Sequence, residues 1–206
     1  MFYEPKNGSG LEHNPLNAII IPRPIGWIST LSVSGIANLA PYSFFNVVAY
    51  TPPQVMFAAT SSHARGGLKD AVADSQSAGE FVVNIATVAL GSKMNASAVP
   101  APHSVDEFEY CGLQKEDSVL VSSPRVAESP IHLECLYTRS ISLPSDTPDE
   151  SNTVVFGEVI GIHIEDSIIT NGKIDYRKLQ SIGRLGYLDF VEVDNMFSME
   201  RPKWKS

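Results

Sequence analysis

The most informative run of this chain reads RPIGWIST at residues 23–30 and continues, after a short turn, as NLAPYSFF at residues 38–45. Residues 25–32 and 36–41 have the length and apolar content of strands, and Ser34-Gly35 between them is typical of a hairpin turn. Aromatic side chains in this run alternate with hydroxyl and amide side chains. Such rings more often fill a core, but with polar neighbours at strand ends they can also enclose a planar heterocycle. The run therefore predicts a β-hairpin beside an aromatic-lined slot.

A second informative block, TSSHARGGLKD at residues 60–70, follows a predicted buried strand at residues 54–60. It offers two hydroxyl donors, a bidentate guanidinium and an ammonium group. These are Ser61, Ser62, Arg65 and Lys69. The pair Gly66-Gly67 permits close backbone approach just before a predicted helix, whose free amides favour an anion. The block predicts a phosphate site, with an ordinary solvated turn as the alternative. Its spacing matches neither GxxxxGK[ST] nor GxGxxG, which disfavours a nucleoside triphosphate or a Rossmann dinucleotide.

Composition narrows the class of protein. The 206 residues fit one generous domain or two small ones, and a hydrophobic fraction of 43% allows a sizeable core. The net charge of −8 argues against nucleic acid as a partner, because phosphate backbones need clustered Lys and Arg. Residues 1–6 lack the start of a signal peptide, and no apolar stretch approaches the roughly 20 residues that span a bilayer. With only Cys111 and Cys135 there is no disulfide framework. We expect a cytoplasmic protein without a membrane partner.

The remaining pattern predicts a mainly β fold. Further strands are expected at residues 80–87, 131–143 and 153–165, the last two long and rich in β-branched residues. Residues 1–22 are expected to form an irregular arm. Because strands and helices do not alternate regularly, a doubly wound parallel sheet is disfavoured. Six or seven strands with inserted helices predict instead a closed or nearly closed antiparallel barrel.

Four short helices are expected between the strands. Residues 68–75 and 89–98 carry two of them. A third should open at the sequence Ser104-Val105-Asp106-Glu107, which has the spacing of a capping box, and should end near Gly112. The fourth covers residues 175–182, with Gly183 placed to terminate it.

Several of these motifs occur together in one known family. Besides the first run, the chain contains KD at 69–70, GEFVVN at 79–84, MNAS at 94–97, DEF at 106–108, ESPIHLEC at 128–135, GEV at 157–159 and RLG at 184–186. In order and spacing this pattern resembles the flavin reductase-like family of FMN-binding split barrels, which includes flavoredoxin and NAD(P)H:FMN oxidoreductases. The resemblance covers roughly residues 15–202.

The resemblance implies a single domain over residues 1–206, folded as a Greek-key split barrel, and a homodimer with FMN at the subunit interface. Residues matching the family's ring and ribityl contacts are Trp27, Ser29, Thr30, Ser43, Phe44 and Phe45. Those matching its phosphate contacts are Ser61, Ser62, Arg65 and Lys69. Asn95 matches a motif that approaches the flavin. Ala71 stands where the family often has Thr, which removes one possible hydroxyl ligand of the phosphate.

Other catalytic or metal-binding patterns are weak. The five histidines show no HExxH or paired spacing, so no metal site is expected. No GxSxG elbow is present to anchor a hydrolase triad. Arg184, flanked by glycines, is a candidate for a site loop, with a solvated turn charge as the alternative. His163 is a second candidate, although a structural surface histidine is the favoured interpretation.

The predicted function is an FMN-dependent oxidoreductase. A reduced nicotinamide, NADH or NADPH, would give hydride to the flavin, and electrons would pass to an acceptor, small molecule or protein, that the sequence does not identify. Because the flavin carries the hard chemistry, no protein nucleophile is required. Three alternatives remain: a non-catalytic electron carrier that keeps FMN bound, a flavin-binding module without turnover, and an enzyme resembling pyridoxamine-phosphate oxidase, whose motifs match poorly.

Overall fold

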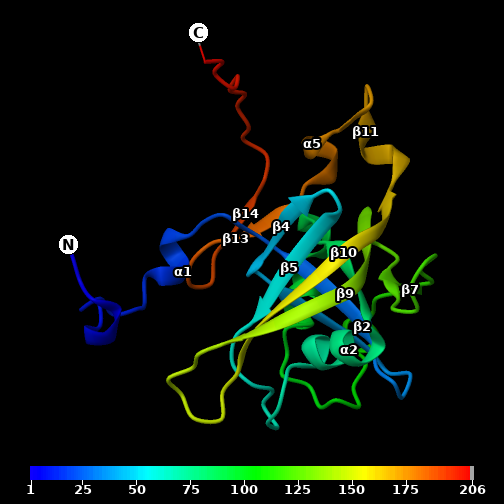
Figure 1. Cartoon of the computed structure of the whole chain (residues 1–206). Coiled ribbons are helices and arrows are strands. Elements are labelled where there is room, and N and C mark those ends of the chain that lie inside the picture. Colours follow the sequence, from blue (N-terminus) through cyan, green and yellow to red (C-terminus); the bar gives the residue numbers. More distant parts are fainter. Residues whose placement is uncertain (205–206) are drawn as a thin grey trace.

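The computed structural model describes residues 1–204, and within them seven antiparallel strands form the main sheet. The order of strands is β3-β2-β6-β9-β10-β5-β4 (Figure 1). Their bounds are β2 Gly26–Leu31, β3 Ala37–Tyr42, β4 Phe45–Tyr50, β5 Pro53–Ala59, β6 Glu80–Ile85, β9 Ile131–Leu143 and β10 Asn152–Ile164. The mainly β prediction and the predicted strand positions are confirmed to within a few residues. The last two positions of the predicted domain lie outside the described residues.

Short elements surround this sheet. The helices are η1 Pro5–Asn7, α1 Leu16–Ile19, α2 Asp70–Ala78, η2 Val88–Leu90, α3 Gly91–Ala96, α4 Glu107–Cys111, η3 Asp166–Ile168 and α5 Tyr176–Leu179. The short strands are β1 Arg23–Pro24, β7 Lys115–Glu116, β8 Arg125–Val126, β11 Ile169–Thr170, β12 Lys173–Ile174, β13 Ile182–Arg184 and β14 Phe190–Glu192. No helix within residues 1–204 is long and apolar enough to cross a membrane.

Two apolar clusters hold these elements together. The first joins β2, β5, β6, β9 and β10 with α2, and the second joins β2 and β3 with α3 and α4. In the first cluster Phe57 and Phe81 meet edge to face with ring centroids 5.4 Å apart. Gly157 makes room for this packing, because a Cβ atom there would lie 2.4 Å from Cζ of Phe81. A residue other than glycine would therefore displace a fully buried ring.

The third predicted helix begins later than the capping box suggests. Asp106 is the N-cap of α4, and its carboxylate accepts from the backbone amides of Phe108 and Glu109. Glu107 does not complete a capping box with Ser104. Its carboxylate is instead buried and accepts from the amide of Leu39 in β3 at 3.0 Å. Glu107 therefore does not cap the helix locally, because its carboxylate satisfies a backbone amide of β3 instead. The predicted end is confirmed, since Gly112 adopts a left-handed conformation with φ of 62°.

The fourth predicted helix ends earlier than expected. α5 stops at Leu179, and Gln180, not Gly183, takes the left-handed position with φ of 48°. Gly183 belongs to β13, where it pairs with Pro24 of β1 and Val191 of β14. Strand pairing over Ile182–Arg184 therefore overrides the helical pattern.

The three-stranded sheet β1-β13-β14 joins distant parts of the chain. It places the loop after β13 against α1 of the N-terminal arm (Figure 1). The approach is close, because a Cβ atom at Gly186 would lie 2.4 Å from Cβ of Ala18. The N-terminal arm and the loop after β13 thus form one wall beside the end of β3.

Candidate functional site

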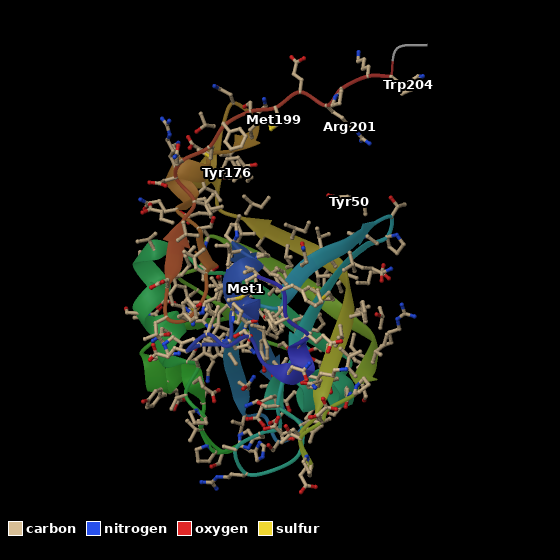
Figure 2. The ribbon with its side chains drawn as sticks, turned by 90° about the vertical axis from the view of Figure 1, so that its left-hand side faces the viewer. Met1, Tyr50, Tyr176, Met199, Arg201 and Trp204 are labelled. Atoms are coloured by element: carbon tan, nitrogen blue, oxygen red, sulfur yellow. The ribbon has the colours of Figure 1, made fainter. Side chains whose placement is uncertain are left out.

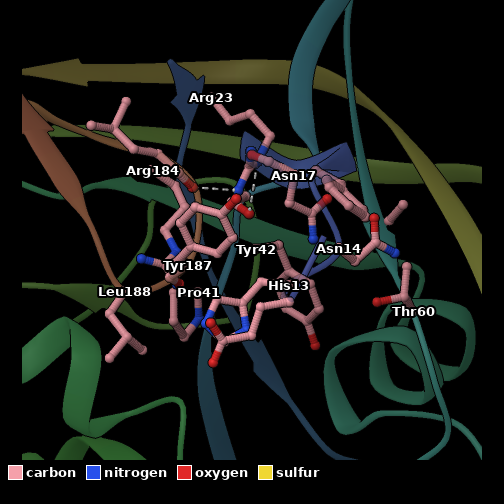
Figure 3. Close-up of a pocket in the computed structure, with 15 residues that line it drawn as sticks. His13, Asn14, Asn17, Arg23, Pro41, Tyr42, Thr60, Arg184, Tyr187 and Leu188 are labelled. Atoms are coloured by element: carbon pink, nitrogen blue, oxygen red, sulfur yellow. Dashed lines mark hydrogen bonds between the residues drawn. The ribbon is translucent and has the colours of Figure 1, made fainter. Parts of the chain in front are cut away.

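Three adjoining cavities surround the end of β3 at Pro41. The main cavity, of about 900 Å³, lies between the N-terminal arm, β3, the end of β5 and the loop after β13 (Figure 3). The loop cavity, about 160 Å³, is bordered by His63, Lys69, Asp70 and Glu107. The side cavity, about 180 Å³, is bordered by α3 and β14. Because all three share Pro41, an extended ligand could pass from one to the next.

The corner between β3 and β4 brings polar and aromatic groups to these cavities. Ser43 and Phe44 lie in this corner and line the main cavity. Ala58 of β5 donates its backbone amide to the carbonyl of Phe44 at 2.7 Å, which ties the corner to β5. Phe45 packs directly over Gly26, where a Cβ atom would lie 2.6 Å from the Phe45 ring. The glycine of the RPIGWIST run is therefore required by the close approach of this ring.

Arg23 organises the walls of the main cavity. Its buried guanidinium donates to the carbonyl of Ile20 at 2.9 Å, to that of Leu185 at 2.9 Å, and to that of Asn17 (Figure 3). It also lies 5.8 Å from the centroid of the Phe44 ring. The side chain of Arg23 thus joins the N-terminal arm, the loop after β13 and the β3–β4 corner.

Arg184 places a second positive charge at the same site. Its guanidinium donates to the carbonyls of Asp189, at 2.9 Å, and Tyr187, and lies 4.5 Å from the centroid of the Phe190 ring. Burial, together with the nearby charge of Arg184, lowers the pKa of Arg23. Within residues 1–204 no carboxylate oxygen lies within 4.0 Å of either guanidinium. The main cavity, which Glu12 also lines, therefore offers two positive charges that form no ion pair among the described residues, in a protein of net charge −8.

The loop cavity has mixed charge. Lys69 borders it beside the carboxylates of Asp70 and Glu107. Burial raises the pKa of Glu107 to about 7, against the opposing effect of the hydrogen bond from Leu39. The carboxylate of Asp70 pairs with His103, whose ring stacks on that of His63 at 4.0 Å. Lys69 thus brings a positive charge to this cavity.

The ligand atoms of His63, Asp70 and His103 lie within 4.8 Å of one another, as those of a metal site would. The backbone already engages both ring nitrogens of His63. Nδ1 accepts from the amide of Arg65 at 3.1 Å, and Nε2 lies 2.9 Å from the carbonyl of Ala101. A cation could bind His63 only if one of these hydrogen bonds broke.

Five of the residues proposed from sequence border these cavities. Ser43 and Phe44 line the main cavity, Lys69 the loop cavity and Asn95 the side cavity, while Arg184 borders both the main and the side cavity. The structure therefore brings together residues that lie up to 141 positions apart, from Ser43 to Arg184.

Three others lie in the core. The side chains of Trp27, Ser29 and Thr30 have no exposed surface. Trp27 Nε1 donates to Ser97 Oγ at 2.9 Å, and the two hydroxyls donate to the carbonyl of Pro124 and the carboxylate of Asp74. None of the three side chains lines the cavities around Pro41, so none of them would contact a ligand bound there.

The remaining phosphate candidates lie on the loop between β5 and α2. Ser62 is engaged by the tip of the β9–β10 hairpin, since its hydroxyl donates to the carbonyl of Asp149 at 2.6 Å and accepts from the amide of Ser151. Ser61 has a positive φ of 69°, and Arg65 is exposed. Thr60, just before them, lines the main cavity. This loop therefore runs from the main cavity at Thr60 to the loop cavity at Lys69.

His163 lies elsewhere in the fold. It is nine positions beyond Val154, which pairs with Ala58 at the main cavity, a separation of roughly 30 Å along β10. Its Nε2 lies 2.5 Å from the buried carboxylate of Glu134. Burial alone would raise the pKa of Glu134, but hydrogen bonds from Val119, His163 and Leu120 outweigh it and lower that pKa. His163 thus joins β10 to β9, away from the cavities around Pro41.

Sequence reasoning missed several residues that line the main cavity. Arg23 and Thr60 stand inside the two quoted runs, so their position beside assigned residues could have identified them. His13, Asn14, Asn17 and Tyr187 carry no local signal. They reach the cavity only because β1 pairs with β13.

Comparison with known proteins identifies the family of this chain and the fold that it shares. A model of the flavin reductase like domain family matches residues 18–180. An uncharacterized protein of Aquifex aeolicus is 40% identical over 175 residues, which are 84% of this chain and 86% of the relative. The crystal structure of nitrilotriacetate monooxygenase component B from Bacillus cereus is 28% identical, with a TM-score of 0.83 over 93% of this chain and 100% of that chain.

A more distant structure shares the fold alone. Flavoredoxin of Desulfovibrio vulgaris (Miyazaki F) is 16% identical, with a TM-score of 0.75 over 93% of this chain and 95% of that chain.

Proposed function

This chain belongs to the flavin reductase-like domain family, and from that premise we propose that it is an FMN-binding oxidoreductase that uses a reduced nicotinamide. The observation that carries the proposal is the pair of guanidinium groups without an ion-pair partner among the described residues, Arg23 and Arg184, at a cavity of about 900 Å³. Cavities of roughly 300–1,000 Å³ are usual for cofactors and small ligands. The protein would act as a cytoplasmic homodimer with no nucleic-acid or membrane partner.

The residues at the site fit the chemistry of FMN. The ring system is flat and carries polar atoms at its edge, and the site offers Ser43 Oγ and the Asn95 amide to such atoms. The phosphate is a dianion that needs hydroxyl and cationic donors. Those donors are on the loop that runs from Thr60 to Lys69. The side and main cavities would thus hold the ring, and the loop would hold the phosphate.

Bound FMN would supply the redox chemistry between a reduced nicotinamide, NADH or NADPH, and an electron acceptor. The chain's own residues would bind and orient FMN and stabilise negative charge that develops beside them. Arg184 is held by two backbone carbonyls and so presents a fixed positive charge with little freedom to reorient. Preorganised positive charge favours states in which negative charge develops on a neighbouring group. Four residues of the arm line the main cavity and would restrict water there: Glu12, His13, Asn14 and Asn17.

Two measurements test this function. FMN added to the purified protein should remain with the protein peak after gel filtration, and the complex should oxidise NADH or NADPH faster than free FMN does. A colourless protein peak, with no quenching of flavin fluorescence on titration, would refute flavin binding. Bound FMN without nicotinamide oxidation would leave flavin binding intact and refute the reductase activity.

Changing Arg184 to alanine should raise the KM for the reduced nicotinamide with little change in FMN affinity. The side chain borders both the main and the side cavity, where it can meet the phosphates of a donor nucleotide. Loss of one charge-assisted contact, about 1.5–3 kcal/mol, corresponds to a KM increase of roughly tenfold or more. Steady-state kinetics with Arg177→Ala as the control, an exposed arginine in α5, measures the effect. Wild-type kinetics in the Arg184 variant would contradict the assignment.

A non-catalytic electron carrier is the second candidate. Its supporting observation is the exposed rim of the main cavity, where Tyr187 is 51% and Leu188 is 87% exposed. An exposed aromatic and apolar rim suits transient docking of a redox protein. FMN that stays bound, accepts electrons from a chemical reductant and shows no nicotinamide turnover would favour the carrier over the enzyme.

A further inference from the structure

The C-terminal tail, residues 194–204, leaves the body of the protein without folding back onto it. It projects from the end of β14 in both views (Figure 1 and Figure 2). Beyond Asp194 the described residues form no backbone hydrogen bond. Yet the tail carries large apolar side chains, with Phe197 85%, Met199 83% and Trp204 94% exposed. An extended segment this rich in apolar surface is typical of a binding element rather than a solvated terminus.

A second uncovered apolar surface lies at the same end of the molecule. It is the β4–β5 hairpin, where Tyr50 is 85% exposed and Val47 and Val48 are 45% and 46% exposed. β4 is an edge strand, because it pairs with β5 alone in the main sheet. Residues 45–50 contain no charged residue and no proline, which are the usual protections of an open edge. Figure 2 places Tyr50 at this end, below the level of the tail.

We propose that the tail of each subunit crosses to a second copy of the chain and packs against the β4–β5 hairpin of that copy. The exchange is reciprocal, so each subunit donates one tail and accepts another about a twofold axis. It gives the homodimer of the proposed function a specific interface, and it does not depend on the flavin.

The length of the tail is sufficient for such an exchange. Eleven residues in extended conformation span roughly 35 Å, which exceeds the length of the six-residue strand β4. The tail can therefore lie along the whole hairpin of a neighbour. An extended chain can also add its backbone hydrogen bonds to the open edge of β4, in the manner of strand addition.

The area that would be covered matches the needs of a stable dimer. Phe and Trp each bury about 150–250 Å² when they enter an interface. With the methionines and the hairpin side chains, two tails cover on the order of 1,500 Å², within the range of standard interfaces. Charge does not oppose the contact, because Asp194 and Glu200 are balanced by Arg201 and Lys203 and the β4 segment is uncharged.

Photo-crosslinking tests where the tail binds. Tyr50 is replaced by p-benzoylphenylalanine in the full-length protein, with the same replacement of Tyr110, 61% exposed in α4, as the control. Irradiation of the Tyr50 variant should give a covalent species of twice 22.4 kDa on a denaturing gel, with the crosslink mapped by mass spectrometry to residues 194–206. The Tyr110 variant should give no crosslink to the tail. A tail crosslink confined to the 22.4 kDa band would show that the tail binds its own subunit and would overturn the proposal, as would a Tyr50 variant with no tail crosslink.

Light scattering tests whether the dimer depends on the tail. A chain ending at Asp194 keeps every hydrogen bond of β14, so it should fold, and its mass should fall toward that of a monomer at concentrations where the full chain is dimeric. Phe197→Asp should act in the same direction, while Val33→Asp, at an 87% exposed valine in the β2–β3 turn, should leave the dimer unchanged. A truncated chain as dimeric as the full one refutes the tail exchange. A monomeric full chain refutes the dimer as well.

Discussion

Replacing Arg65 and Lys69 together by alanine is expected to weaken FMN binding at least tenfold while leaving riboflavin binding nearly unchanged. Only FMN carries the phosphate dianion, and both side chains belong to the loop that would hold it, with Lys69 at the loop cavity. Charge-assisted hydrogen bonds contribute about 1.5–3 kcal/mol each, and 1.4 kcal/mol corresponds to a factor of ten. Fluorescence titration of both ligands against the wild type and the double variant measures the difference.

A control must separate local contacts from the general field of the protein. Arg139→Ala with Lys173→Ala removes the same two charges from exposed positions outside this loop and should change neither affinity by more than a small factor. If FMN and riboflavin weaken equally in the Arg65 and Lys69 variant, the phosphate is held elsewhere. If the control weakens FMN as strongly, the effect belongs to net charge and not to the loop.

Replacing Glu107 by glutamine is expected to stabilise the protein at pH 8 but not at pH 4. Burial raises the pKa of Glu107 to about 7, so between pH 4.5 and 7 the folded state keeps a proton that the unfolded state releases. The contribution of Glu107 to the free energy of unfolding is therefore fully present below the pKa of the unfolded state, 4.5. It is lost as pH rises through 7, and the loss is at most about 3 kcal/mol. Glutamine mimics the protonated acid and still accepts from the amide of Leu39.

Urea unfolding at several pH values measures this effect. The stability difference between the glutamine variant and the wild type should grow from near zero at pH 4 to its full value at pH 8. Glu109→Gln, on the same helix but with its side chain 81% exposed, should show no such pH-dependent gain. An equal difference at every pH would mean that the pKa of Glu107 is the same in the folded and unfolded states, so that burial does not raise it.

The strands were the most predictable part of the fold. β9 matches its predicted residues 131–143, and β10 differs by one residue at each end. Both are long runs of β-branched and alternating apolar residues, for which the sequence pattern is strong. The helices were less predictable at their ends. Asp106 caps α4 because the carboxylate of Glu107 is taken by Leu39, and α5 ends at Leu179 because Ile182–Arg184 pairs as a strand.

The candidate site was predictable only in part. Ser43, Phe44, Lys69, Asn95 and Arg184 were found because they stand in recognisable motifs, and the structure places them at adjoining cavities. Trp27, Ser29 and Thr30 stand in the same motif but are buried. Their motif does not distinguish the two faces of β2, because β2 lies between β3 and β6 and packs on both sides.

Local sequence was sufficient for the strand content, the β2–β3 hairpin and the family. These depend on residue periodicity, turn chemistry and short motifs, which act over a few neighbouring residues. The main cavity depends on long-range contacts instead. Arg23 donates to a carbonyl 162 positions away, and the pairing of β1 with β13 brings the arm against the loop after Arg184. No local pattern encodes such a contact, because its free energy comes from burial and hydrogen bonds that exist only once the whole chain has folded.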